Sequence, residues 1–245
     1  MPIRTKEELI ALLIEDGYLK TPAVIEAFRA IDRKNFVSSE FEGDAYANHP
    51  LPTDAGQTIS QPLTVAFMIE LLAPQPGDKV LDIGAGSGWQ TALLAKIVTD
   101  GGAPGKVFAL ERVAKLAKIA EENVAKYGFI ESGAVDVILK DGKLGQSSEA
   151  PFDKIIAAAS AETIPLVWKA QLKIGGRLVA PVGHNIVVLE KRSKEDFEEK
   201  RYFGFNFVPL LGGVDKTKVP LDGIKGSATM GTTDGSDENI PRRLP

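Results

Sequence analysis

The residues best placed to do chemistry surround a glycine-rich turn in the stretch VLDIGAGSGWQTALLA, residues 80–95. An apolar run there reaches Asp82, glycines alternate with small residues over 84–88, and an apolar helical pattern follows. Glycines in such a turn let main-chain amides approach a ligand that a Cβ atom would push away. A second apolar run ends at Glu111, about twenty residues after the loop, where a carboxylate can bind both ribose hydroxyls. The pattern predicts a nucleotide-type cofactor at the top of a parallel sheet.

The details of the loop favour S-adenosylmethionine as that cofactor. The loop reads G-A-G-S-G, without the G-x-G-x-x-G spacing of a dinucleotide site or the Gly-Lys-Ser/Thr ending of a phosphate-binding loop. A carboxylate at Asp82 would repel a pyrophosphate, but it suits a ligand with a positive charge near the loop. S-adenosylmethionine has a sulfonium, an ammonium and a ribose diol, so it meets all three constraints. The alternative is a glycine-rich turn that binds nothing.

Composition limits the other classes of function. The chain has 245 residues, a common length for one α/β domain. It has no cysteine, which excludes disulfides, thiolate metal sites and cysteine nucleophiles and indicates a cytoplasmic setting. Its two histidines, His49 and His184, are too few for a histidine-rich metal centre, so we expect no metal. The net charge of −4 does not favour a nucleic-acid partner, and no apolar run is long enough to span a membrane.

The N-terminal part of the chain predicts helices, and the C-terminal part predicts a tail. Helices are expected over 6–15, 21–31 and 62–72, with a polar, proline-rich segment before the third. We expect these elements to form a helical cap over about residues 1–72 of a single domain, 1–212. From 213 to 245 the composition shifts to Gly, Thr, Ser, Asp and Pro, with little apolar surface to bury.

Between cap and tail, apolar runs alternate with helical patterns such as 112–127. Strands are expected over 79–83, 106–111, 135–140, 154–159 and 177–181. Such alternation is typical of right-handed crossovers and a doubly wound, parallel sheet. The last two apolar runs, 186–192 and 201–208, flank a charged turn and predict an antiparallel hairpin.

This order of elements resembles the Rossmann-like fold of S-adenosylmethionine-dependent methyltransferases, an α/β fold with a seven-stranded, mostly parallel sheet. The segment AYANHPLPTDAGQTISQPLTVAFMIELL, residues 45–72, resembles the signature of the protein-L-isoaspartate (D-aspartate) O-methyltransferase family. Three further stretches resemble that family in the same order: APFDKIIAAASAETIP from Ala150, QLKIGGRLVAPVG, and FVPLLG ending at Gly212. The resemblance covers roughly residues 5–212. It implies a repair enzyme that methylates isoaspartyl and D-aspartyl residues of damaged proteins with S-adenosylmethionine.

A carboxylate substrate makes modest demands on the protein. It is already ionised near pH 7, so it needs no general base, and the protein must mainly align oxygen, methyl carbon and sulfur. The resemblance implies that Ser60 holds the reacting carboxylate, with Thr58 and Ile59 on the cofactor side. The alternative role for Ser60 is an N-cap of the helix that begins near Pro62.

Twelve residues are the expected cofactor contacts: Thr58, Ile59, Asp82, Gly84, Ala85, Gly86, Ser87, Gly88, Glu111, Arg112, Asp141 and Gly142. Four of them have alternatives. Glu111 would also be a favourable charge at the start of the next helix, and Asp82 would brace the loop through main-chain hydrogen bonds. Asp141 and Gly142 resemble the family's Gly-Asp-Gly element beside the adenine, but Lys140 replaces its first glycine, and an ordinary Asp-Gly turn is the rival interpretation.

Other functions stay open at this point. A methyltransferase of the same fold acting on a small molecule or RNA would keep the loop and Glu111 without needing the Gln57–Pro62 run. A module that binds the cofactor but has lost catalysis would keep both, and a nicotinamide-dependent dehydrogenase is the most distant option. The favoured hypothesis is a monomeric enzyme whose partners are isoaspartyl peptides and proteins.

Overall fold

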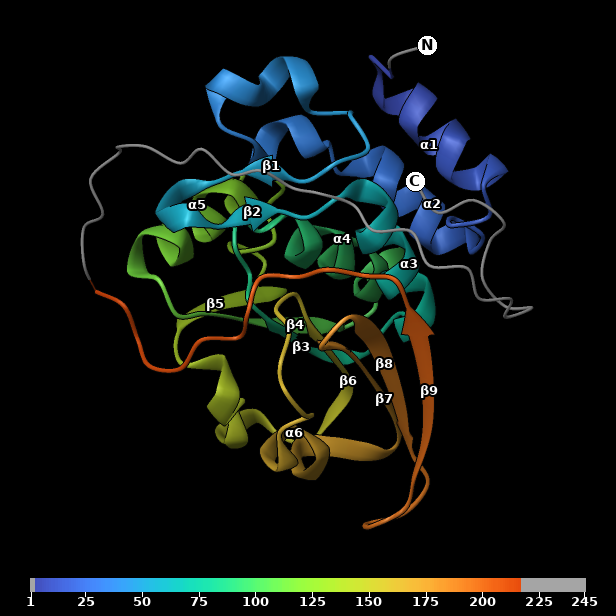
Figure 1. Cartoon of the computed structure of the whole chain (residues 1–245), viewed down its shortest axis with the longest axis vertical. Helices are drawn as coiled ribbons and strands as arrows, with labels where there is room; N and C mark the ends of the chain where they lie inside the picture. The colour runs from blue at the N-terminus through green and yellow to red at the C-terminus, as the bar shows by residue number, and fades with distance from the viewer. Residues whose placement is uncertain (1–2, 217–245) are drawn as a thin grey trace.

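The computed structural model describes residues 3–216, and its main element is one seven-stranded sheet in the order β5-β4-β3-β6-β7-β8-β9 (Figure 1). The strands are β3 (Lys79–Ile83), β4 (Lys106–Glu111), β5 (Val135–Leu139), β6 (Phe152–Ala157), β7 (Leu172–Val182), β8 (Asn185–Lys191) and β9 (Phe197–Phe203). The first five run parallel to one another, and β8 and β9 add antiparallel pairs at one edge. The expected doubly wound sheet with a C-terminal hairpin is confirmed.

Helices cover both faces of this sheet (Figure 1). On one face lie α3 (Pro62–Leu72), α4 (Trp89–Val98) and α5 (Ala114–Ala125), with α1 (Lys6–Glu15) and α2 (Pro22–Ala30) packed outside them. The short helix α6 (Leu166–Gln171) lies on the other face. Alternate residues of β3 serve the two layers, since Val80 belongs to the larger apolar cluster and Leu81 to the smaller one. The sheet is therefore buried on both sides, as the apolar strand sequences require.

Short-range signals explain where the N-terminal helices begin. Thr5 caps α1 in a capping box, because its hydroxyl accepts from Glu8 N at 3.1 Å while the Glu8 carboxylate accepts from Thr5 N at 3.2 Å. Proline occupies the first position of α2 and of α3, where a missing N–H costs nothing. The start of α3 at Pro62 fixes the direction in which the preceding segment approaches the sheet.

The last strand was predicted in the wrong place. The structure puts β9 at Phe197–Phe203 rather than 201–208, because a tight turn, with Arg192 N bonded to Asp196 O at 2.8 Å, reverses the chain earlier. The sequence FEEKRYF is charged on this edge strand, so it lacks the apolar alternation that marks a strand. Strand β7 also begins earlier than expected, at Leu172, and helix α6 was not predicted.

Two segments cross the carboxyl ends of the strands (Figure 1). The first, which we call the flap, is residues 51–60; it contains the antiparallel pair β1 (Leu51–Pro52) and β2 (Thr58–Ile59). The second, which we call the strap, is residues 204–215, which run from the end of β9 across the sheet edge towards α5.

The strap is held by main-chain hydrogen bonds at three points. At its start, Phe205 N donates to His184 O at 3.1 Å. Near its middle, Ser160 N donates to Val208 O at 2.8 Å and Leu210 N donates to Ser160 O at 2.7 Å. At its far end, Asp215 N donates to Arg112 O at 2.8 Å and Ala114 N donates to Asp215 O at 3.0 Å. These contacts extend three residues beyond the expected domain end at 212. The rest of the expected tail, 217–245, lies outside the described residues.

Candidate active site

A cavity of about 450 Å³ lies at the carboxyl ends of β3, β4 and β6, where open α/β sheets bind their ligands. Its walls come from the glycine loop after β3, the end of β4, the flap and the strap. Ten predicted site residues line it: Thr58, Ile59, Ser60, Gly84, Ala85, Gly86, Ser87, Glu111, Arg112 and Gly142. The fold thus brings together residues that are far apart in the sequence.

Glu111 ties the glycine loop to the end of β4. Its Oε2 accepts from Gly86 N at 3.0 Å, and its Oε1 accepts from Val113 N at 2.9 Å. A carboxylate has about four acceptor positions, so two remain for a ligand that reaches the cavity. Glu111 is buried but lines the cavity, which is the placement expected for a residue that binds a ribose diol. It therefore both shapes the loop and keeps capacity for the cofactor.

Gly88 is needed for packing rather than for the cavity. It has φ +90°, and a Cβ atom there would lie 3.0 Å from Ala120 O of α5. Asn123 of the same helix donates from Nδ2 to Ser87 O at 2.9 Å. The second half of the loop is thus pressed against α5, while Gly88 itself does not line the cavity.

Asp82 lies beneath the loop and is fully buried. Its carboxylate accepts from Gln90 Nε2 at 2.8 Å and from Thr91 Oγ1 at 2.6 Å, so it holds the first turn of α4 through side chains, not through main-chain amides. Burial, together with the nearby charge of Glu111, raises the pKa of Asp82 to about 6, although the hydrogen bonds from Thr91 and Gln90 act in the opposite direction. Asp82 does not line the cavity, so its predicted contact with the cofactor stays a prediction.

This raised pKa predicts a pH-dependent difference in stability between the wild type and Asp82→Asn. Between pH 7 and 4 the folded protein takes up a proton at Asp82 near pH 6, whereas an unfolded aspartate does so near 3.9. The wild type should therefore gain free energy of unfolding relative to the variant as the pH falls, by on the order of 2 to 3 kcal/mol. Urea unfolding of both proteins at several pH values measures this. A difference that is constant from pH 7 to 4 would contradict the raised pKa.

Ser60 lies between β2 and α3, and the structure excludes its alternative role as a helix cap. The N-cap of α3 is Gln61, whose Nε2 donates to Asn48 O at 2.9 Å. The Ser60 carbonyl accepts from Arg33 Nη2 at 3.1 Å. Its hydroxyl has no hydrogen-bond partner among residues 3–216, and the residue lines the cavity. The hydroxyl is therefore free to bind a ligand group.

An ion pair links the tip of the flap to helix α5. Lys115 of α5 lies with its Nζ 2.7 Å from Asp54 Oδ1. Both side chains are partly exposed, so this pair contributes little stability by itself. It does join the flap to the helix that follows Glu111.

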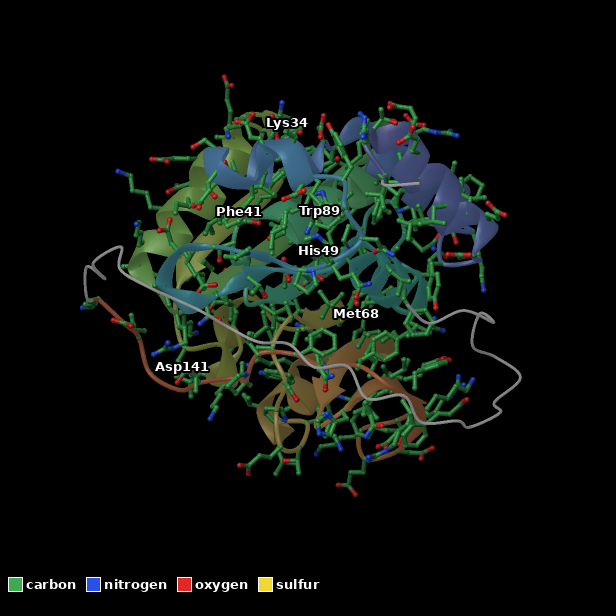
Figure 2. The ribbon with its side chains drawn as sticks, turned by 45° about the horizontal axis from the view of Figure 1, so that its top comes forward. Lys34, Phe41, His49, Met68, Trp89 and Asp141 are labelled. Carbon is green, nitrogen blue, oxygen red and sulfur yellow. The ribbon has the colours of Figure 1, made fainter. Side chains whose placement is uncertain are left out.

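The loop after β5 combines a cavity residue with a turn residue. Gly142 lines the cavity, and a Cβ atom there would lie 2.5 Å from Ile83 Cγ2, so only glycine fits. Asp141 accepts from Lys143 N at 2.9 Å and from Gly213 N of the strap at 2.6 Å, and Figure 2 shows it beside the strap. Lys140 points its amine to Gln146 Oε1 at 2.6 Å. Because Asp141 does not line the cavity, the rival interpretation as an Asp-Gly turn describes its present contacts, and its adenine contact stays a prediction.

The sequence of this chain matches a known protein family over most of its length. The family model described as protein-L-isoaspartate(D-aspartate) O-methyltransferase matches residues 4–215. The chain belongs to this family. The resemblance carried by residues 45–72 and the three later stretches is confirmed.

Individual relatives agree with the family match. The chain is 42% identical over 208 residues to the protein-L-isoaspartate O-methyltransferase of Aeropyrum pernix, covering 83% of this chain and 78% of the relative. It is 43% identical over 211 residues to that of Methylorubrum extorquens, covering 84% and 86%. A Plasmodium falciparum protein described as a protein-L-isoaspartate O-methyltransferase, solved with S-adenosyl-L-homocysteine, shares the fold with a TM-score of 0.76 at 24% identity. That likeness covers 85% of this chain and 99% of the solved one.

In this isoaspartate methyltransferase family member, the strap is the part of the cavity wall that sequence reasoning missed. Residues 206–211 line the cavity, together with Gln57, Trp89 and Leu116. The run FVPLLG was recognised as part of the family resemblance but was not assigned to the site. Its signal is an apolar run with a central proline that follows the hairpin and does not alternate as a strand would.

Proposed function

We propose that the chain is a protein-L-isoaspartate O-methyltransferase that uses S-adenosylmethionine to methylate L-isoaspartyl and D-aspartyl residues in damaged proteins. The observation that carries this proposal is that one cavity joins the free hydroxyl of Ser60 to the glycine loop braced by Glu111. The family match over residues 4–215 and the names of the relatives support the substrate class.

The residues of the cavity fit S-adenosylmethionine. Glu111 retains acceptor positions for two ribose hydroxyls, and the positive φ of Gly84 and Gly86 leaves the loop backbone open towards the cavity. Arg112 follows in the wall, with its Nε donating to Gly213 O of the strap at 2.9 Å. When bound, S-adenosylmethionine supplies an electrophilic methyl group on a sulfonium. We propose the twelve predicted contacts as the binding site, with Asp82, Gly88 and Asp141, which do not line the cavity, supporting its walls.

The remaining requirement is to orient a carboxylate that is already ionised. Ser60 can donate one hydrogen bond to a carboxylate oxygen of the substrate, which limits the directions from which the second oxygen attacks. Alanine residues 158 and 159 line the cavity at the end of β6, where small side chains leave room for a substrate backbone. Proton transfer plays no part in this step, so neither histidine of the chain is needed in it.

Specificity for isoaspartate follows from the position of the carboxylate. In an isoaspartyl linkage the main chain runs through the side-chain carbon, and the free group is the α-carboxylate. When the cavity binds the substrate backbone in a fixed position, this α-carboxylate lies in a different place from the side-chain carboxylate of a normal aspartate. Misplacement by about an ångström can cost roughly a hundredfold in rate. The cavity should therefore discriminate by geometry.

The test is methyl transfer from radiolabelled S-adenosylmethionine to a peptide that contains L-isoaspartate, with the same peptide containing normal aspartate as the control. We expect label in the first peptide and none above background in the second. If the protein binds S-adenosylmethionine but labels neither peptide, the repair function is wrong, and the small-molecule, RNA or non-catalytic alternatives take its place.

Oligomeric state and compartment stay predictions of the sequence, namely a monomer in the cytoplasm. Within residues 3–216, no helix combines the length and the apolar character needed to cross a membrane. We also propose that the methyltransferase domain is a single unit, with the strap contacts at Asp215 as part of it.

A further inference from the structure

Arg33 is a buried cation whose partners are all neutral. It lies at the start of a 3-10 turn, Arg33–Phe36, with 2% of its surface exposed. Its two terminal nitrogens donate to four carbonyl oxygens: Ala45 at 2.8 Å, Ala47 at 3.4 Å, His49 at 3.2 Å and Ser60 at 3.1 Å. Among the described residues, no carboxylate forms an ion pair with it.

Burying this charge is costly, and packing alone does not require it. Burial lowers the pKa of Arg33, and an unpaired cation in a protein interior costs several kcal/mol unless other groups replace its hydration. Here four carbonyl dipoles and the face of Trp89, whose ring centroid is 5.3 Å from the guanidinium carbon, replace part of that hydration, while the buried Arg33 Nε has no hydrogen-bond partner. Figure 2 shows His49 and Trp89 close together in the same region of the molecule. An apolar side chain could fill the same space without the desolvation cost of the charge, but it would leave four carbonyl oxygens without this donor.

The four carbonyls that Arg33 binds lie at the two ends of the flap. Three of them precede the flap, and the fourth, that of Ser60, ends it. The same Nη2 atom binds His49 O and Ser60 O, so one nitrogen joins the two ends of the flap. Asn48 adds a second link, since its side-chain oxygen accepts from Leu63 N at 3.0 Å.

We infer that Arg33 is a positioning residue for methyl transfer, which clamps the two ends of the flap so that the Ser60 hydroxyl faces the glycine loop at a fixed distance. This inference rests on the proposed function. The planar guanidinium presents its N–H donors in a rigid fork, so it can hold carbonyls that diverge in direction. A lysine amine keeps the charge but is a single point and cannot span the same set. Arg33 touches no reacting atom, because it does not line the cavity.

The variants are Arg33→Lys and Arg33→Met, with Phe36→Leu as the matched control. Phe36 lies in the same turn, is 3% exposed and stacks on Tyr127, so its replacement loosens the same region without touching the flap carbonyls. For each protein, kcat and KM for the isoaspartyl peptide, the Kd for S-adenosylmethionine and the melting temperature are measured. Amide hydrogen exchange of the flap is followed as a readout that needs no activity.

We expect both Arg33 variants to lose about thirty- to a hundredfold in kcat, since the Ser60 hydroxyl is displaced by a fraction of an ångström to an ångström. The Kd for S-adenosylmethionine should weaken by no more than about fivefold, because only Thr58 and Ile59 of the proposed contacts lie in the flap, whereas the glycine loop and Glu111 keep their contacts. Exchange at Thr53 and Gln57, whose amides are bonded within the flap, should become faster. Phe36→Leu, compared at an equal distance below its melting temperature, should keep kcat within about threefold and leave flap exchange unchanged.

Several results would overturn the inference. The first is that Arg33→Lys leaves both kcat and the hydrogen exchange of the flap unchanged. The second is that Phe36→Leu loses as much kcat as the Arg33 variants do. The third is that the Kd for S-adenosylmethionine weakens by the same factor as kcat falls. If Arg33→Met does not fold, Arg33→Lys decides the outcome, because lysine keeps a long side chain that ends in a hydrogen-bond donor. A wild-type protein that labels no isoaspartyl peptide shows instead that the proposed function is wrong. An active wild type with active Arg33 variants shows that only the positioning role is wrong.

Discussion

Replacing Glu111 with alanine should weaken S-adenosylmethionine binding by about 2 to 3 kcal/mol, which is roughly 30- to 150-fold in Kd. The carboxylate is the group in the cavity wall best able to accept from two ribose hydroxyls, and hydrogen bonds to a charged acceptor are the strong ones. The alanine variant also leaves Gly86 N and Val113 N without their acceptor, so the loop loses its brace as well. Calorimetric titration with S-adenosylmethionine measures the loss directly.

Two further variants separate the ligand contact from the brace. Glu111→Gln keeps the size of the side chain and one strong acceptor, so its melting temperature should stay closer to that of the wild type while its Kd still rises. Glu121→Ala, on the exposed side of α5, changes the same residue type and should leave Kd unchanged. A folded Glu111→Ala protein with wild-type affinity would remove Glu111 from the binding site.

Replacing Ser60 with alanine should lower kcat on the isoaspartyl peptide by about ten- to a hundredfold, the size expected for one hydrogen bond to a charged group. The hydroxyl has no partner among residues 3–216, so its removal leaves no protein donor or acceptor unsatisfied and should hardly change the melting temperature. Steady-state kinetics together with a Kd for S-adenosylmethionine distinguish the two halves of the site, because only the kinetics should change.

The control for Ser60 is Ser132→Ala, which removes a hydroxyl that bonds to Phe129 O at the far end of the sheet, away from the cavity. It should behave as the wild type in every measurement. Equal turnover by Ser60→Ala and the wild type would leave the repair function standing and assign Ser60 to a structural role.

The sequence was informative wherever function depends on side chains at fixed spacing along the chain. Asp82, the glycine loop and Glu111 follow two strands whose apolar runs have clear ends, so the strand bounds 79–83 and 106–111 were predicted correctly. Ser60 was reached through the family resemblance, and the structure adds that Gln61 is the helix cap. In these cases the residue pattern along the chain is enough to predict where the residue lies in the folded protein.

The parts that were missed depend on contacts between distant segments. The strap is placed by main-chain bonds to Ser160 and to residues 112 and 114, and main-chain pairing of an irregular segment has no side-chain signature. Arg33 was passed over because arginine is almost always exposed, and nothing in the letters IDRKNF marks its burial. The role of Asp82 beneath the loop depends on Gln90 and Thr91 in the first turn of α4, a contact that spacing permits but does not require.

The position of the strap near the end of the described chain also determines when, during protein synthesis, the binding cavity can be completed. Protein synthesis proceeds from the N-terminus, and segments begin to fold as they are made. The glycine loop, Glu111 and the flap are complete before β7 to β9 have been synthesised, but one wall of the cavity comes from residues 206–211. A nascent chain that has not reached these residues has an open cleft in place of a closed binding site. We therefore expect translation products that end before residue 206 to lack this wall and to transfer no methyl group, so that activity first appears after the last strand has been synthesised.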